Sequence, residues 1–298
     1  MTGRSRQPVE HRFADADGDI CWFEWGAARP DRPSLLLLHA TGFHARVWDA
    51  MVDCFPSDQH VIAPDARGHG RSFRPESLGN WADTASDLAS FTQGLGLGQL
   101  VVAGHSMGGF CGAWLAAHHP ERVARLILVD PVIMDPAMYP EGNSSPVAGV
   151  EDHPVARRRN HWDSMEQMVE RMGSRAPYDA WLPDILQDYC RHGLLPLPDG
   201  GFELACPPAL EASVYMGSWR SNPYCFISDI GCPTSVIRAK QEERSGLMDF
   251  SNSPTWPGLA AALRHGRDLH WADRTHFIPM EDPARLAAFI MQEIESAS

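Results

Sequence analysis

Short apolar runs alternate with helical patterns along much of this chain, and this alternation restricts its fold more than any other feature. The apolar runs predict strands at residues 19–26, 34–38, 60–66, 99–105 and 124–130. The segments between them predict an amphipathic stretch at 44–55 and helices at 81–93 and 107–119. Strands that alternate with helices of about ten to fifteen residues favour right-handed crossovers and a parallel sheet covered on both faces. The sequence therefore predicts an α/β fold with a doubly wound, mostly parallel sheet.

The alternation stops after Asp130 and resumes near residue 233. The intervening segment is rich in Pro, Trp, Met and charged residues. Its pattern predicts helices near 161–173, 179–192 and 207–217 and predicts no strand. Beyond it we expect strands and helices in alternation again, at 233–239, 256–264, 267–272 and 281–295. The domain prediction is one core, formed by residues 1–131 and 229–298, with a helical insertion of residues 132–228.

Composition and charge narrow the class of partner. The net charge of −13 disfavours a nucleic acid or an anionic membrane, because both repel an acidic surface. The one basic run, residues 157–159, is interpreted as solvated surface. No stretch resembles a secretory signal or a membrane span, and the seven cysteines are scattered without metal or disulfide spacing. We expect a cytoplasmic protein with free thiols and a small-molecule substrate; the oligomeric state is left open.

Residues 101–109 read VVAGHSMGG, which places the pattern G-x-S-x-G between a buried strand and a helix. Glycines flank Ser106 because so tight a turn leaves no room for side chains at Gly104 and Gly108. The turn exposes the serine hydroxyl at the carboxyl edge of the sheet, at the positive end of a helix. Ser106 is therefore predicted to be a nucleophile.

Four segments of the chain resemble the α/β-hydrolase superfamily, of the serine esterase type with a helical cap: LLLLHATGFHARVW, PDARGHGRS, GHSMGG and THFIPMEDP. The resemblance implies that the triad follows the order serine, acid, histidine, and that the insertion is a cap over the active site. It also assigns an aspartate nucleophile to epoxide hydrolases and haloalkane dehalogenases, which share the fold. Ser106 argues against both of these activities.

A serine nucleophile needs a general base and an acid that orients it. His276, in a loop before the last predicted helix, matches the catalytic histidine of the family. For the acid we favour Asp130, which ends a predicted strand at the carboxyl edge of the sheet. The alternative is Glu242, ahead of Glu243, because the family often places its acid after the strand at 233–239, where this chain lacks the usual aspartate.

The resemblance also indicates an oxyanion hole made by the backbone N–H groups of Thr41 and Met107. Aromatic side chains of the loop at residue 43 and of the insertion are expected to line a largely apolar pocket; the candidates are Phe43, Trp162, Tyr215 and Trp219. We expect no metal or organic cofactor, because no His, Asp or Glu cluster has metal-ligand spacing in the sequence.

The expected activity is hydrolysis of a carboxylic ester or lactone of a small, largely apolar substrate through an acyl-enzyme. The same triad also fits an amidase, an acyltransferase or a carbon–carbon bond hydrolase. A further alternative is a non-catalytic ligand-binding protein on the hydrolase scaffold, because fold alone does not fix function.

Overall fold

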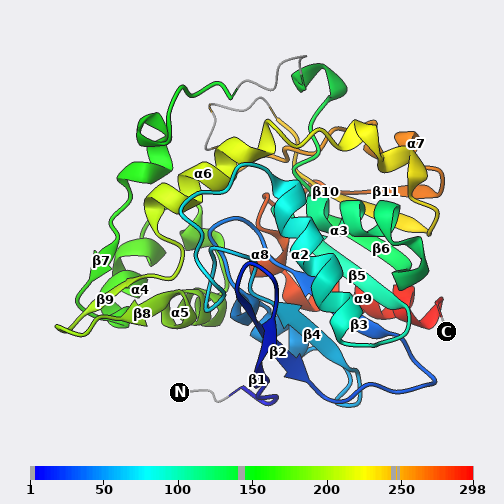
Figure 1. The fold of residues 1–298 in the computed structure, drawn as a ribbon, viewed down its shortest axis with the longest axis horizontal. Coiled ribbons are helices and arrows are strands. Elements are labelled where there is room, and N and C mark those ends of the chain that lie inside the picture. The colour runs from blue at the N-terminus through cyan, green and yellow to red at the C-terminus, as the bar shows by residue number, and fades with distance from the viewer. Residues whose placement is uncertain (1–3, 140–144, 243–245, 247–248, 298) are drawn as a thin grey trace.

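The computed structural model describes residues 4–139, 145–242, 246 and 249–297 of the chain. Its centre is an eight-stranded sheet with the strand order β1-β2-β4-β3-β5-β6-β10-β11 (Figure 1). The strands are β1 (Val9–Ala14), β2 (Asp19–Trp25), β3 (Ser34–Leu38), β4 (Val61–Pro64), β5 (Leu100–His105), β6 (Val123–Val129), β10 (Thr234–Ala239) and β11 (Gly266–Trp271). Only β2 runs antiparallel to its two neighbours, so the predicted mostly parallel sheet is confirmed.

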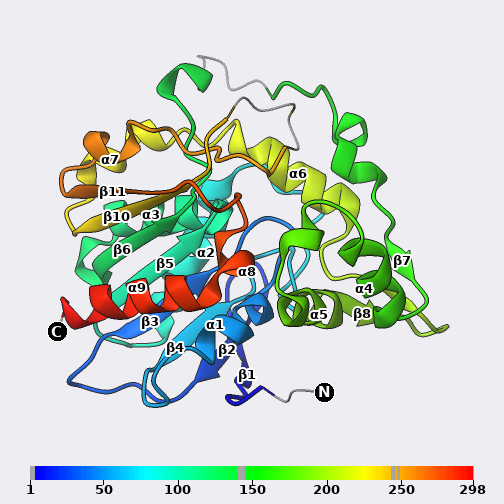
Figure 2. The same cartoon turned by 180° about the vertical axis from the view of Figure 1, so that it is seen from behind.

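Helices cover both faces of the sheet (Figures 1 and 2). Leu36 of β3 belongs to the same buried cluster as Phe110 of α3, whereas Leu35 and Leu37 belong to the cluster that contains Ile290 of α9. Both faces of β3 are buried because consecutive side chains point to opposite sides of a sheet. The α-helices outside the insertion are α1 (Asp49–Val52), α2 (Trp81–Gly94), α3 (Met107–His118), α7 (Leu259–Ala262), α8 (Ile278–Glu281) and α9 (Pro283–Glu295).

Between β6 and β10 the chain leaves the sheet and forms a separate group of short elements (Figure 1). Its α-helices are α4 (Met165–Gly173), α5 (Pro183–His192) and α6 (Pro208–Ser218). The expectation that this stretch holds no strand was wrong, because β7 (His161–Trp162), β9 (Phe202–Leu204) and β8 (Leu194–Pro196) pair into a small antiparallel sheet. Strands of two or three residues are too short to display an alternating pattern.

Short 3₁₀ turns connect the larger elements, at Ala45–Trp48, Pro120–Arg122, Pro136–Met138, Val150–Asp152, Pro154–Arg157, Tyr178–Ala180, Pro223–Cys225 and Ile227–Asp229. The helix predicted at 256–264 is reduced to the single turn of α7. The seven cysteines are free thiols. Within the part of the chain that the structure describes, no helix has both the length and the apolar character needed to cross a membrane.

Candidate active site

Ser106 stands at the sharp turn between β5 and α3, with a φ of 58°. A Cβ on Gly104 would lie 2.2 Å from the carbonyl oxygen of Gly108, and one on Gly108 would lie 2.3 Å from that of Leu38. Both contacts are with backbone, which cannot move aside cheaply. The predicted need for glycine on both sides of the serine is thus confirmed, and the turn holds the serine in a conformation that a non-glycine residue rarely adopts.

Ser106, His276 and Asp130 form one hydrogen-bonded chain. The Ser106 Oγ lies 3.1 Å from His276 Nε2, and His276 Nδ1 lies 2.7 Å from Asp130 Oδ2. All three side chains are buried. An aspartate that accepts a hydrogen bond from the Nδ1–H group keeps the proton on Nδ1. Nε2 is then free to accept the serine proton, which is the tautomer that a general base requires.

Asp130 lies immediately beyond the end of β6 and, with Ser106, is one of two non-glycine residues in the described chain with positive φ, here 43°. Its other oxygen, Oδ1, accepts hydrogen bonds from Ala239 N at 2.8 Å and from Ser253 Oγ at 2.5 Å. The alternative acid, Glu242, is instead exposed and lies 2.9 Å from Lys240 Nζ. Glu243 lies outside the described residues. Among the described carboxylates considered for the acid, only Asp130 therefore touches His276.

Two neighbours of His276 were not anticipated from the sequence. The fully buried His105 donates from Nε2 to the carbonyl oxygen of His276 at 2.8 Å, which fixes the loop that carries the imidazole. The ring of Phe250 stacks on the imidazole with its centroid 5.8 Å away. Nothing in the local sequence indicates the contact of His105, because its partner lies 171 positions further along the chain.

The loop after β3 brings Thr41 to the same cavity as Ser106. The Thr41 N–H has no acceptor among the described residues, and its Oγ1 is buried without a partner. Met107 is the first residue of α3, where backbone N–H groups lack intrahelical acceptors. An oxyanion requires unpaired N–H donors near the nucleophile.

The next residue, Gly42, is fixed by contacts from two sides. Its N–H donates to His69 Nε2 at 3.0 Å, and burial lowers the pKa of His69 to about 4, so the ring stays neutral and accepts. From the insertion, Tyr189 Oη donates to the Gly42 carbonyl at 3.4 Å. The Glu211 carboxylate packs so closely that a Cβ on Gly42 would lie 2.4 Å from Oε1, and Arg158 Nη1 donates to its other oxygen at 2.5 Å.

A cavity of about 330 Å³ opens above Ser106 and His276. Of the four side chains expected in a pocket, Tyr215 and Trp219 line this cavity, and Phe43 and Trp162 do not. Phe43 packs against Trp181 and other aromatic rings, and Trp162 lies under Arg159 elsewhere in the insertion. Lining residues that the sequence did not single out for the pocket include Trp81, Val132, His153, Ser218, Phe250 and Pro254. The walls are mostly apolar, which suits an uncharged substrate.

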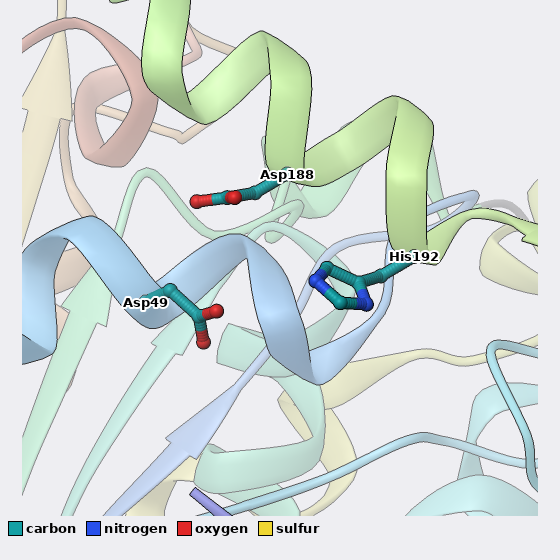
Figure 3. Close-up of side chains that lie close together, drawn as sticks. All are labelled: Asp49, Asp188 and His192. Carbon is teal, nitrogen blue, oxygen red and sulfur yellow. The ribbon is translucent and has the colours of Figure 1, made fainter. Parts of the chain in front are cut away.

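The fold also brings together Asp49, Asp188 and His192, whose ligand atoms lie within 4.8 Å of one another (Figure 3). Asp188 and His192 lie four positions apart on α5, but Asp49 lies on α1, far away in the sequence, so local spacing does not indicate the complete cluster. Both carboxylates already have cationic partners, with Arg46 Nη2 2.6 Å from Asp49 and Arg4 Nη2 2.5 Å from Asp188. Burial lowers the pKa of His192 to about 3. We assign no metal to this cluster, because two guanidinium groups occupy the charges that a cation would need.

Comparison with known proteins supports the observed fold. The family model of the alpha/beta hydrolase fold matches residues 33–153. Lipase LipV of Mycobacterium tuberculosis is 30% identical over 279 residues, which cover 91% of this chain and 95% of the lipase. The 3-oxoadipate enol-lactonase 2 of Acinetobacter baylyi is 33% identical over 100 residues, which cover 34% of this chain and 38% of that protein.

Among solved structures, that of E-2-(acetamidomethylene)succinate hydrolase superposes with a TM-score of 0.78 over 97% of this chain and all of the other, at 19% sequence identity. Identity this low establishes the fold alone. With the match to lipase LipV over nearly its full length, the chain belongs to the α/β-hydrolase family. It is a hydrolase of that family.

Proposed function

We propose that the protein is a serine hydrolase that cleaves a carboxylic ester or lactone of a small, largely apolar substrate through an acyl-enzyme. The observation that carries the proposal is the hydrogen-bonded chain from Asp130 through His276 to Ser106 at the base of a mostly apolar cavity. A buried serine with an aligned base has the arrangement of an activated nucleophile. We further propose that residues 132–228 form a cap, since Met134, Tyr215 and Trp219 of this segment line the cavity.

In the first half-reaction, His276 Nε2 takes the proton of Ser106 as Oγ attacks the ester carbonyl carbon. The carbonyl oxygen becomes an oxyanion that accepts hydrogen bonds from the N–H groups of Thr41 and Met107, each worth roughly 3 kcal/mol of barrier lowering. Asp130 stabilises the imidazolium that forms. The imidazolium then protonates the leaving alkoxide, and the alcohol departs, leaving the acyl group on Ser106.

In the second half-reaction, His276 takes a proton from a water molecule that attacks the acyl carbon. The second oxyanion accepts hydrogen bonds from the same two N–H groups. When this intermediate collapses, the His276 imidazolium protonates Ser106 Oγ and the carboxylic acid leaves. In a lactone the alcohol stays tethered to the acyl group, so one hydroxy acid is released. The relatedness to lipase LipV and to an enol-lactonase supports both an open ester and a cyclic one as substrate.

Pre-steady-state hydrolysis of p-nitrophenyl butyrate tests the proposal. The wild-type protein is expected to release a burst of p-nitrophenol in proportion to enzyme and to be labelled by a fluorophosphonate. Ser106→Ala is expected to lose both, with kcat at least roughly 10⁴-fold lower. Ser86→Ala, on the exposed side of α2, is the matched control and should keep the burst.

Absence of both burst and labelling in the wild-type protein would refute the enzyme proposal and favour a ligand-binding protein. Substrate panels separate the other activities that a triad permits. If the protein cleaves an anilide faster than every ester and lactone tested, it is an amidase and the ester proposal is wrong. If it cleaves a carbon–carbon bond faster than all of them, it is a carbon–carbon bond hydrolase.

A further inference from the structure

A second cavity, of about 300 Å³, lies within the insertion and shares no lining residue with the cavity above Ser106. Five of the residues that line it are arginines: Arg157, Arg158, Arg159, Arg171 and Arg175. The others are Trp162, Met172, Ala176 and Tyr178, so no carboxylate is found among the described residues of its wall. This is a concentration of positive charge in a chain whose net charge is −13.

Three of these five arginines are exposed to solvent and have no carboxylate partner among the described residues. The guanidinium groups of Arg157, Arg171 and Arg175 make no hydrogen bond or ion pair within the described residues. By contrast, Arg125 Nη1 lies 2.8 Å from Glu293, and Arg238 Nε lies 2.6 Å from Asp268. Several like charges around one cavity raise the local positive potential, and this potential attracts an anion.

The remaining two arginines are held in place by the protein. Arg159 stacks over Trp162, with the guanidinium carbon 4.6 Å from the ring centroid, and donates to Gln167 Oε1 at 2.7 Å. Its nearest carboxylate oxygen, on Asp163, is 3.7 Å away. Arg158 is tied to the buried Glu211. The wall is therefore partly preorganised, which reduces the conformational entropy lost on binding.

We propose that this cavity is an anion site that binds a phosphate or diphosphate group. Guanidinium groups present planar pairs of N–H donors that match two phosphate oxygens at once, and several of them suit a ligand with more than one negative charge. The volume accommodates more than a single phosphate. The proposal is independent of ester hydrolysis, because it concerns different residues and is tested without substrate.

Isothermal titration calorimetry of the full-length protein at about 0.15 M ionic strength, where screening between exposed charges is substantial, tests the site. Inorganic pyrophosphate is the first probe and adenosine diphosphate the second. Saturable binding of pyrophosphate is expected, and the double variant Arg171→Gln/Arg175→Gln should weaken it at least tenfold, since each lost guanidinium removes charge-assisted hydrogen bonds. The control Arg220→Gln/Arg264→Gln loses the same charge at exposed positions outside the cavity and should bind as the wild type does.

Tighter binding of adenosine diphosphate than of pyrophosphate would support the site and assign it to an organic phosphoester. Equal binding would support a site for the diphosphate group alone. The proposal is overturned if neither probe binds saturably, if sodium chloride at equal ionic strength gives the same heat, or if both double variants lose affinity equally.

Discussion

Replacing Asp130 by asparagine is the sharpest test of the proposed triad, because the surroundings of this residue dictate how the amide must sit. Oδ1 accepts from Ala239 N at 2.8 Å and from Ser253 Oγ at 2.5 Å. An amide nitrogen cannot accept either bond, so the asparagine oxygen must keep this position. Its NH₂ group then takes the place of Oδ2, which lies 2.7 Å from His276 Nδ1.

The consequence is a change of tautomer rather than a loss of packing. Facing an N–H donor, Nδ1 of His276 must accept, so the ring proton moves to Nε2. A protonated Nε2 cannot take the proton of Ser106, and the negative charge that stabilises the imidazolium is also gone. A change of this kind lowers kcat by roughly 10⁴-fold in a serine triad, which corresponds to about 5 kcal/mol of transition-state stabilisation.

The assay is steady-state hydrolysis of p-nitrophenyl butyrate by Asp130→Asn and by Glu242→Gln, with circular dichroism of each variant to check folding. Glu242 is exposed and lies beside Lys240, so its variant should stay within about twofold of the wild type. Asp130→Asn within tenfold of wild-type activity, or a collapse in Glu242→Gln alone, would refute the assignment of the acid.

Three further outcomes follow from contacts near the site. Gly108→Ala should lower the free energy of unfolding by about 2 kcal/mol in urea titrations, because its Cβ would lie 2.3 Å from a backbone oxygen, whereas Gly98→Ala, in open space, should be neutral. Glu211→Ala should cost about 3 kcal/mol in the same assay, because it leaves Arg158 partly buried without its anion. The pKa of His69 is lowered to about 4 in the folded protein, so below its ordinary value of 6.5 the unfolded chain binds a proton that the folded protein does not, and the free energy of unfolding falls. His69→Gln removes this group and should therefore reduce the fall in stability between pH 7.5 and 5 by about 2 kcal/mol.

Contradictory results for these three are equally specific. Equal stability of the two glycine variants would mean that the turn relaxes without cost. An unchanged stability in the glutamate variant would show that water compensates the exposed part of the arginine, whose side chain is 26% accessible. If the free energy of unfolding of wild type and of His69→Gln depends on pH in the same way, the proton affinity of this histidine does not change on folding.

The core strands and the nucleophile were predictable because their signals are local. A run such as SLLLL is apolar at every position because β3 is covered on both faces, and the glycine requirement at Gly104 and Gly108 arises within one turn. The edge strand β1 was missed for the opposite reason. Its residues, VEHRFA, are mostly exposed or half-exposed and carry charge, so they lack the apolar pattern of a strand.

The pocket was predictable only in part, because its walls depend on how the insertion packs. Phe43 follows the loop of Thr41 and was expected beside the substrate. In the structure its ring instead contacts Trp181 and Tyr189, at centroid distances of 5.5 and 5.1 Å. His153, by contrast, lines the cavity although nothing in its local sequence distinguishes it. The contacts of Phe43 join residues more than a hundred positions apart, and neither periodicity nor motif encodes them.

The two candidate positions for the acid illustrate where sequence reasoning narrows a choice and where only packing decides it. Strands β6 and β10 are parallel neighbours, with Val129 opposite Ile237, so the acid could follow either strand and still lie at the same edge of the sheet. In this chain the backbone of β10 serves the acid of β6: Ile237 O accepts from Asp130 N at 2.7 Å, and Ala239 N donates to its carboxylate. A carboxylate placed after β10 would have to reach His276 without these donors. This chain lacks an aspartate after β10, and the backbone of β10 instead positions Asp130 at the end of the neighbouring strand β6. The kcat values of the Asp130 and Glu242 variants are therefore expected to differ by orders of magnitude.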